Sequence, residues 1–220
     1  MNPMDFEQAR FNMIEQQVRP WDVLDQQVLN VMGNTPREAY VPEKYRALAF
    51  ADINIPLAHG QVMMAPRVEG RLLQALAIRQ SDSVLEIGTG SGYLTACLAA
   101  LGNHVTSYEI FPELSQAAGE KLTANGCRNV TLIEGDAAGG INSGNRYDVI
   151  AVTGSLPELQ TTFHNNLTGG GRLFMITGTP PVMEAVLVTR IDDGNWKTES
   201  LFETSLPPLV NAVTAQRFAL

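Results

Sequence analysis

The chain has 220 residues, of which 45% are hydrophobic and 17% charged, and this is enough for one α/β domain with a full core. A formal net charge of −8 argues against a protein that binds nucleic-acid phosphates or an anionic membrane, and mildly favours a cationic ligand. The N-terminus lacks the apolar segment of a signal peptide, and no apolar stretch is long enough to cross a membrane, so we expect a cytoplasmic protein. Cys97 and Cys127 form no ligand or redox motif, so we expect reduced thiols and no bound metal.

The first part of the chain is predicted to be mainly helical. Helices are expected over residues 6–18, 26–32, 41–50 and 67–78. Asp5 and Asp25 precede the first two helices and can cap them, and Pro66 stands at the start of the last one. Between the third and fourth helices, prolines and a glycine interrupt the sequence and indicate a loop.

From Ser83 onward the sequence alternates between strands and helices. Strands are predicted over residues 83–88, 104–110, 129–136, 147–154 and 169–178, and helices over residues 93–101, 112–125 and 156–167. Residues 184–204 predict two further strands joined by the turn "DDGN". Nearly continuous apolar strands separated by helices indicate a mostly parallel sheet with helices on both faces, and the last two strands should form an antiparallel hairpin at its edge.

The stretch "VLEIGTGSGYLTACLA" is the most informative part of the sequence. Gly88, Gly90 and Gly92 follow a predicted strand and precede a predicted helix, so that a ligand can lie against bare main chain there. A dinucleotide-binding fingerprint would need glycine where Tyr93 stands, and a P-loop would need a Gly-Lys-Ser/Thr sequence that is absent. The spacing therefore disfavours both of these phosphate-binding motifs.

Three acidic residues stand at the ends of successive predicted strands. Glu86 precedes the glycines, where a carboxylate would repel a pyrophosphate and would suit a ligand that carries an ammonium group. Glu109 can accept hydrogen bonds from both hydroxyls of a ribose, and Asp136 can accept one from an adenine amino group. Because the carboxyl ends of parallel strands converge on one crevice, S-adenosylmethionine (SAM) suits all three acids. The residues expected to bind it are Glu86, Gly88, Thr89, Gly90, Ser91, Gly92, Glu109, Ile110, Asp136, Ala137 and Thr153.

The same stretch resembles the first motif of the protein-L-isoaspartate O-methyltransferases, and the resemblance extends over about residues 10–180. The segment "VLNVMGNTPREAYVPEKYRALAFADINIPLAHGQ" resembles the N-terminal region of that family, "NVTLIEGDAAGG" its Gly-Asp-Gly segment, and "YDVIAVTG" with "LTGGGRLFMITG" its fourth and fifth strands. The resemblance implies a Rossmann-like SAM-dependent methyltransferase fold in one domain over residues 1–220. An N-terminal helical extension with a substrate-side loop would span residues 1–80, the SAM-binding core residues 81–180, and the C-terminal strands residues 181–220.

The resemblance further implies an O-methyltransferase that uses SAM to methylate a carboxylate, which in this family belongs to isoaspartyl residues during protein repair. A carboxylate is ionised at neutral pH, so that its methylation needs no general base. The expected partner is a peptide or protein carboxylate, with a small molecule left open. Nucleic acids and membranes are not expected as partners, and the oligomeric state is left open.

One departure from the family pattern lies in the loop before the fourth helix. In the family the Gln that corresponds to Gln61 is followed by Thr-Ile-Ser, so that the active-site Ser falls on Met64 and the Thr on Val62. Losing a hydroxyl that orients the acceptor would cost about 1–3 kcal/mol. His59 is the histidine nearest to this loop position and is the second catalytic candidate. Ala137 also stands where the family usually has Gly.

Alternative functions follow from the missing hydroxyl. The protein could be a SAM-dependent methyltransferase with a different small-molecule or protein acceptor, or it could bind SAM without catalysing a reaction. A nicotinamide-dependent oxidoreductase is a further alternative, and Glu86 and Tyr93 both speak against it.

Overall fold

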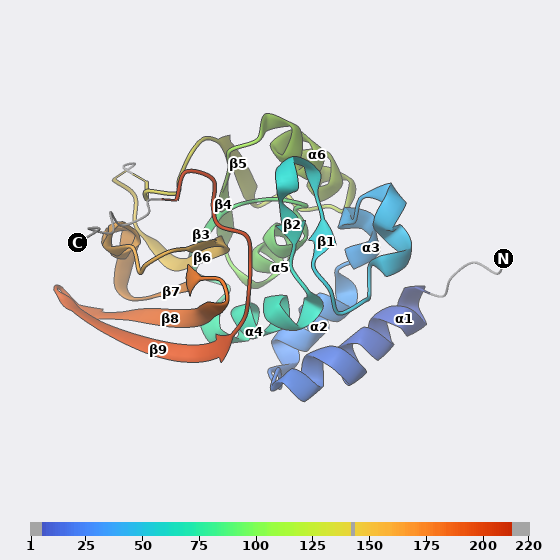
Figure 1. The fold of residues 1–220 in the computed structure, drawn as a ribbon, viewed down its shortest axis with the longest axis horizontal. Coiled ribbons are helices and arrows are strands. Elements are labelled where there is room, and N and C mark those ends of the chain that lie inside the picture. The colour runs from blue at the N-terminus through green and yellow to red at the C-terminus, as the bar shows by residue number, and fades with distance from the viewer. Residues whose placement is uncertain (1–5, 142–143, 213–220) are drawn as a thin grey trace.

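The computed structural model describes residues 6–141 and 144–212, and within them it contains a seven-stranded sheet (Figure 1). The strands are β3 (Ser83–Ile87), β4 (His104–Glu109), β5 (Val130–Glu134), β6 (Tyr147–Leu156), β7 (Leu167–Thr179), β8 (Val182–Asp192) and β9 (Asn195–Glu203). Their order in the sheet is β5-β4-β3-β6-β7-β8-β9. The pairs from β5 to β7 are parallel, whereas β8 is antiparallel to both β7 and β9. The predicted fold class, a mostly parallel α/β sheet with an antiparallel C-terminal hairpin, is confirmed.

Most of the helices precede the sheet or connect its first strands. They are α1 (Phe6–Met13), α2 (Gln26–Asn34), α3 (Arg37–Tyr40), α4 (Pro66–Leu76), α5 (Tyr93–Leu101) and α6 (Pro112–Ala124), with the π-helical η1 (Ile14–Val18) and the 3-10 segments η2 (Arg19–Trp21), η3 (Glu43–Leu48), η4 (Ala58–Gly60) and η5 (Thr161–Asn166). The Asp25 carboxylate accepts hydrogen bonds from the N–H groups of Gln27 and Val28, so the predicted cap of α2 is confirmed. Asp5 lies outside the described residues. In the part of the chain that the structure describes, no helix is long and apolar enough to cross a membrane.

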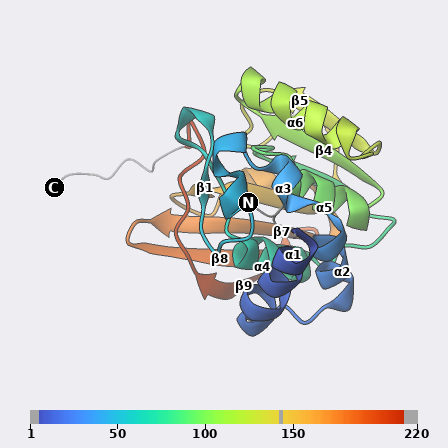
Figure 2. The same ribbon diagram turned by 90° about the vertical axis from the view of Figure 1, so that its right-hand side faces the viewer.

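The apolar core lies on both faces of the sheet, because alternate residues of a strand point to opposite faces. Val84 of β3 and Phe174 of β7 belong to one cluster of buried side chains, which also includes residues of α2, α4 and α5. Figure 2 shows α1, α2 and α4 gathered together near α5. Leu85 and Leu173, the neighbours of those two strand residues, belong to the second cluster, in which Phe163 of η5 is fully buried. The N-terminal helices are therefore part of the same core as the sheet.

The prediction of a helix over residues 156–167 is wrong. β6 continues to Leu156, whose side chain is fully buried, and Pro157 follows directly. A residue before proline is disfavoured in the helical region, and the main chain of Ser155 is hydrogen-bonded to the C-terminal segment instead. Only Thr161–Asn166 winds into the short η5.

The helix predicted over residues 41–50 is shorter than expected. Val41 and Pro42 are extended, with ψ angles of 140° and 139°, and they separate α3 from η3. The residue before a proline avoids the helical region, so the chain cannot stay helical through Val41. The result is two short helical segments instead of one.

The loop predicted between the third and fourth helices is a small hairpin. Strands β1 (Ile55–Pro56) and β2 (Val62–Met63) pair antiparallel, and η4 connects them. The N–H of Leu57 donates to the carbonyl oxygen of Gln61 at 2.8 Å and closes the turn. This hairpin brings residues 61–64 to the carboxyl edge of the sheet, where they line the cleft described next.

Candidate active site

A cleft opens at the carboxyl ends of the parallel strands. It holds about 820 Å³ of space that no atom occupies, a volume that includes its open mouth. Its lining comes from the ends of β3, β4 and β6, the segment after β5, the β1–β2 hairpin, α4, α5 and residues 206–210. This is the crevice that the sequence predicts at the strand ends.

The glycine loop forms part of the floor of this cleft. Gly88 has a φ of 96°, and a Cβ atom on it would lie 2.4 Å from Oγ1 of Thr153. The Thr153 hydroxyl donates to the carbonyl oxygen of Gly88 at 2.7 Å, so the bare loop and β6 lie against each other. Gly90 has a φ of 54°, and its N–H donates to Oε2 of Glu109 at 2.8 Å. The loop geometry thus depends on glycine, as the sequence predicts.

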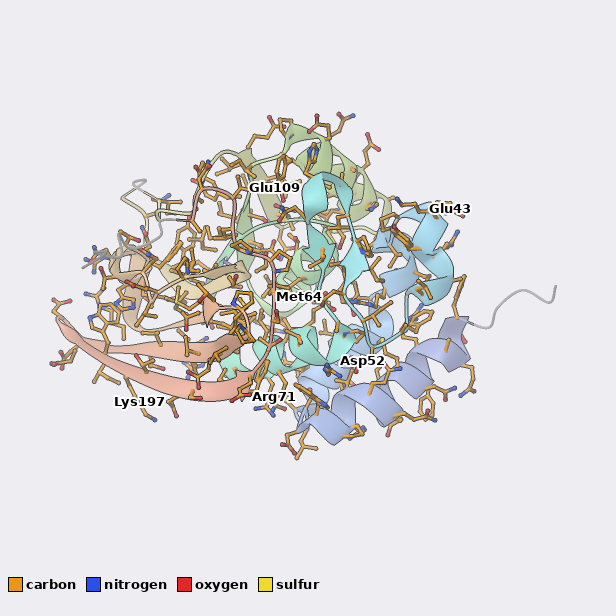
Figure 3. All side chains as sticks on the ribbon, viewed as in Figure 1. Glu43, Asp52, Met64, Arg71, Glu109 and Lys197 are labelled. Atoms are coloured by element: carbon orange, nitrogen blue, oxygen red, sulfur yellow. The ribbon has the colours of Figure 1, made fainter. Side chains whose placement is uncertain are left out.

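Glu109 at the end of β4 is buried and lines the cleft (Figure 3). Its Oε2 accepts the Gly90 N–H, and its Oε1 accepts the N–H of Phe111 at 3.1 Å. A carboxylate can accept about four hydrogen bonds, so both oxygens keep capacity for a ligand. Ile110, the next predicted site residue, also lines the cleft. The position and remaining acceptor capacity of Glu109 are compatible with the predicted ribose contact.

Glu86 is not among the residues that line the cleft. Its side chain points to the sheet face covered by α5, where Oε2 accepts hydrogen bonds from the hydroxyls of Thr95 and Ser107, both at 2.6 Å. Burial raises its pKa to about 8, and Oε1 has no hydrogen-bond partner among the described residues. The Ser107 hydroxyl is in turn 2.6 Å from that of Thr89, which lines the cleft. Glu86 is therefore connected to the cleft through two hydroxyl groups.

The remaining predicted ligand-binding residues divide into two groups. Asp136, Ala137 and Ser91 line the cleft, whereas Gly92 does not and lies against Ala118 of α6 instead. Asp136 is exposed: its Oδ1 accepts the Ala138 N–H at 3.0 Å and its Oδ2 accepts from the Asn211 amide at 2.8 Å. The structure thus brings Asp136 to the cleft, hydrogen-bonded to the C-terminal segment.

Met64 lies near the middle of the molecule in Figure 3, and it lines the cleft with Met63. Both side chains are buried, at 5% and 3% exposure, so both pack and face the cleft at once. The main-chain carbonyl of Met64 accepts a hydrogen bond from Nη2 of Arg37 at 2.6 Å. Arg37 is fully buried, and its hydrogen bond fixes the main chain at Met64.

Glu69, in the first turn of α4, is a buried acid in the cleft wall. Its Oε2 accepts a hydrogen bond from Nη1 of Arg37 in a buried ion pair. Burial raises the pKa of Glu69 to about 7, and the attraction of Arg37 offsets part of that rise. Arg37 also donates from Nε to the carbonyl of Ala49 at 2.8 Å, so one guanidinium joins three segments of the chain.

His59 is exposed and is not among the cleft-lining residues. Its ring stacks on Phe111, with centroids 4.1 Å apart and planes 3° from parallel. Its Nε2 lies 3.4 Å from Oε2 of Glu113. Because Phe111 itself lines the cleft, the structure places His59 at the rim, where it joins the hairpin to the segment after β4.

The C-terminal segment forms a wall of the cleft that the sequence analysis did not assign. Residues 206, 207, 209 and 210 line it. The N–H of Ser155 donates to the carbonyl of Pro207 at 3.0 Å, and the N–H of Leu209 donates to the carbonyl of Ser155 at 2.9 Å. The Ser155 hydroxyl also donates to the carbonyl of Leu206 at 2.9 Å. The segment thus pairs with the end of β6.

Arg37 and Glu69 were also missed as site residues. Arg37 lies in the quoted segment "TPREAYVP" and carries no local sign that it becomes buried. Glu69 stands three and four positions before Leu72 and Leu73, on the apolar side of α4. A charged residue on the buried face of a helix is the signal that could have found it.

A family model described as "Protein-L-isoaspartate(D-aspartate) O-methyltransferase (PCMT)" matches residues 8–214. A protein-L-isoaspartate O-methyltransferase of Rhodopseudomonas palustris is 36% identical over 201 residues, which is 91% of this chain and 92% of that protein. The enzyme of the same name from Aeropyrum pernix is 34% identical over 209 residues, covering 93% of this chain and 80% of the relative.

A solved structure with the same fold comes from Plasmodium falciparum. It is described as that of a protein-L-isoaspartate O-methyltransferase in complex with S-adenosyl-L-homocysteine. The TM-score is 0.80 at 19% identity, and the match covers 93% of this chain and 97% of the other. The likeness confirms the overall fold.

Proposed function

Since the chain belongs to the protein-L-isoaspartate(D-aspartate) O-methyltransferase family, we propose that it methylates the carboxylate of isoaspartyl residues in damaged proteins. SAM is the methyl donor, and the protein is an O-methyltransferase. The observation that carries the proposal is that the matched region, residues 8–214, contains every segment that lines the cleft.

The residues of the cleft suit SAM. Gly88 and Gly90 leave main chain uncovered along the floor, where a side chain on Gly88 would collide with Thr153. Glu109 keeps acceptor capacity for ribose hydroxyls, and Asp136 stands one strand further along the edge, where an adenine amino group can donate to it. We propose that Gly88, Gly90, Glu109 and Asp136 bind the donor, together with Thr89, Ser91, Ile110, Ala137 and Thr153.

Glu86 and Gly92 support this site from behind. Glu86 accepts from Ser107, whose hydroxyl meets that of Thr89, so we propose that it positions the glycine loop. Gly92 allows α5 to start close to α6, because a Cβ atom there would lie 3.1 Å from that of Ala118. Both residues would then act on the donor indirectly.

When bound, SAM supplies a methyl group that its sulfonium centre has already activated. The chain has to position the reactants and exclude water. The hairpin and residues 206, 207, 209 and 210 both line the cleft and can exclude water from it. An isoaspartyl carboxylate is ionised at neutral pH, so the chain does not have to remove a proton. This agrees with the position of His59 at the rim, outside the lining.

A second candidate function is a SAM-dependent methyltransferase with another acceptor. It is favoured by Met64, which offers an apolar side chain to the cleft where the family's active-site Ser would offer a hydroxyl. The Arg37 bond to the Met64 carbonyl holds the main chain in place, so the difference at this position lies in the side chain. A less polar acceptor would suit this wall better.

The test is incubation of the full chain with methyl-labelled SAM and an isoaspartyl peptide. We expect a base-labile methyl ester, with little label on the same peptide carrying ordinary aspartate. Gly90→Asp is the inactive control, because it places a side chain and a negative charge in the floor of the cleft. Transfer no greater than that of the control would contradict the proposal.

A Met64→Ser variant separates the two acceptor candidates. A gain of roughly tenfold to a hundredfold with the isoaspartyl peptide would favour the second candidate, since it would mean that the natural chain lacks a contact this acceptor needs. Unchanged or lower activity would favour the isoaspartyl acceptor with Met64 in place.

We also propose a cytoplasmic location and peptide or protein substrates. Cys97 and Cys127 are both free thiols, as is usual in reducing compartments. The net charge of −8 disfavours direct binding to nucleic acid.

A further inference from the structure

We infer that Glu69 binds the ammonium group of the donor's amino-acid tail through the carboxylate oxygen that Arg37 leaves uncovered. The inference rests on SAM as the donor and assigns a cleft residue that the sequence analysis did not single out. It gives Glu69 the role that was expected of Glu86.

Glu69 lies at the part of the cleft that the tail of the donor should reach. Asp136 follows β5, Glu109 ends β4 and the glycine loop follows β3, and these strands are neighbours in that order. A ligand with its adenine at Asp136 and its ribose at Glu109 therefore has its tail beyond the glycine loop. Glu69 lines the cleft on that side, next to the start of α5, because its partner Arg37 lies 4.7 Å from the ring centroid of Tyr93.

The two carboxylate oxygens of Glu69 differ in their hydrogen bonding. Oε2 accepts the bond from Arg37, whereas Oε1 accepts no hydrogen bond from the described residues. Arg37 cannot turn to cover it without breaking other bonds, because its other two nitrogens donate to the carbonyls of Ala49 and Met64. Glu69 is a buried residue that lines the cleft, and Oε1 is not one of the fully buried atoms without a partner, so this oxygen keeps some exposure. A cationic donor would stabilise it most.

The other acids in and behind the cleft are placed less well to bind the ammonium group. Glu86 is sealed behind the floor and bonded to Thr95 and Ser107, so it cannot reach a ligand tail. Glu109 accepts two main-chain N–H groups at the ribose position, and Asp136 lies farther along the sheet edge. Among the described residues that line the cleft, Glu69 is the carboxylate left for the tail.

The experiment is a binding cycle with two ligands and three forms of the full chain. Isothermal titration calorimetry would compare S-adenosylhomocysteine with its deamino analogue, which has hydrogen in place of the ammonium group. The variants are Glu69→Gln, which keeps an oxygen for Arg37, and Glu38→Gln. Glu38 is the matched control, because it also pairs with an arginine, Arg10, and is nearly buried but does not line the cleft.

We expect the wild type to bind S-adenosylhomocysteine roughly tenfold to a hundredfold more tightly than the deamino analogue. In Glu69→Gln this preference should fall to about threefold or less, while affinity for the deamino analogue changes little. Glu38→Gln should keep the wild-type ratio. If Glu69→Gln keeps the full preference for S-adenosylhomocysteine over the deamino analogue, the inference is overturned. This holds even if the variant raises the KM for the peptide.

A second measurement does not depend on the variant folding. In a crystal structure of the wild type with S-adenosylhomocysteine, the ligand nitrogen should lie within hydrogen-bond distance of Glu69 Oε1, and a separation above about 4 Å would overturn the inference. If S-adenosylhomocysteine does not bind the wild type at all, both SAM as the donor and this role of Glu69 are contradicted. Tight binding without transfer to isoaspartyl peptide would contradict only the proposed acceptor.

Discussion

At the scale of single residues, burial raises the pKa of two carboxyl groups, one in the wall of the cleft and one behind its floor. Glu86 has two hydroxyl donors on one oxygen and none on the other, and desolvation by burial raises its pKa to about 8. Glu69 has an arginine partner, and its pKa is raised to about 7. Burial of an ionisable carboxyl group is unfavourable at these positions and points to function, because an apolar residue would pack there at lower cost.

The first prediction concerns Glu86→Gln and pH. The folded pKa lies above the unfolded value, so between about pH 4.5 and 8 the folded state holds more protons and its stability falls as pH rises. Glutamine does not titrate, so the variant should gain stability over the wild type by about 4 kcal/mol more at pH 9 than at pH 5. Urea unfolding at both pH values measures this, and a difference independent of pH would contradict the assigned pKa.

The second prediction concerns the contact between Gly88 and Thr153. Gly88→Ala has to accept a positive φ and a Cβ atom 2.4 Å from the Thr153 hydroxyl, and should lose about 2–5 kcal/mol of unfolding free energy. Gly126→Ala is the matched control, because Gly126 has a φ of 77° and open space around its Cβ position. It should lose about 1–2 kcal/mol. Equal losses in denaturant unfolding would mean that backbone conformation alone, and not the close contact, requires glycine at Gly88.

At the scale of elements, the cleft is lined by segments that lie far apart in the sequence. Arg37 joins α3 to the hairpin through Met64 and to α4 through Glu69. The ring stack of His59 on Phe111 joins the hairpin to the segment after β4. Residues 206–210 pair with the end of β6. Two walls of the site thus depend on long-range contacts, while the floor is one continuous loop.

This difference explains what could be read from the sequence. The strand, the glycines and α5 follow each other directly, so residue spacing alone predicts the floor and the strand-end acids. The sequence predicts a helix from the end of β6 because the partners of Ser155 are distant. Ser155 is hydrogen-bonded to Leu206, Pro207 and Leu209, which lie 51 to 54 positions later in the chain. Arg37 and Glu69 are 32 positions apart, and no local sequence pattern predicts that they form an ion pair. Glu86 was placed at the ligand because the strand end was foreseen but the face of its side chain was not.

The third prediction tests the pairing of the C-terminal segment with β6. Ser155→Ala removes the hydroxyl bond to the Leu206 carbonyl, worth about 1 kcal/mol, so the amides of Leu206, Leu209 and Val210 should exchange about fivefold faster with solvent. Affinity for S-adenosylhomocysteine should fall by a similar factor, because the segment lines the cleft. Ser83→Ala is the control, since that hydroxyl bonds Asp148 at the other end of the sheet. Faster exchange without weaker binding would mean that the wall does not touch the ligand.

At the scale of the whole molecule, the N-terminal helices and the sheet share one core. Val28 of α2, Leu72 of α4, Leu98 of α5 and Phe174 of β7 belong to a single cluster of buried side chains, and Met64 of the cleft wall belongs to it as well. A ligand that binds the cleft therefore contacts a wall that is continuous with the main core. Its binding free energy should stabilise the chain as one unit and not only the loops around the cleft.

The fourth prediction follows from this continuity. At a concentration about 100 times its Kd, S-adenosylhomocysteine should add about 2.7 kcal/mol of stability, which corresponds to a rise in Tm of roughly 5–10 °C for a chain of this size.

The two tryptophans report on different regions: Trp21 stacks edge-on against Phe202 beside the N-terminal helices, and Trp196 stacks on His164 at the other sheet face. In Trp21→Phe and Trp196→Phe variants, each with one remaining tryptophan, fluorescence melting should give the same shift, equal to that from circular dichroism. NADH at the same concentration should give none, because the glycine loop lacks the dinucleotide spacing. A shift seen by one tryptophan and not by the other would mean that the two regions unfold separately, and would contradict a single cooperative unit.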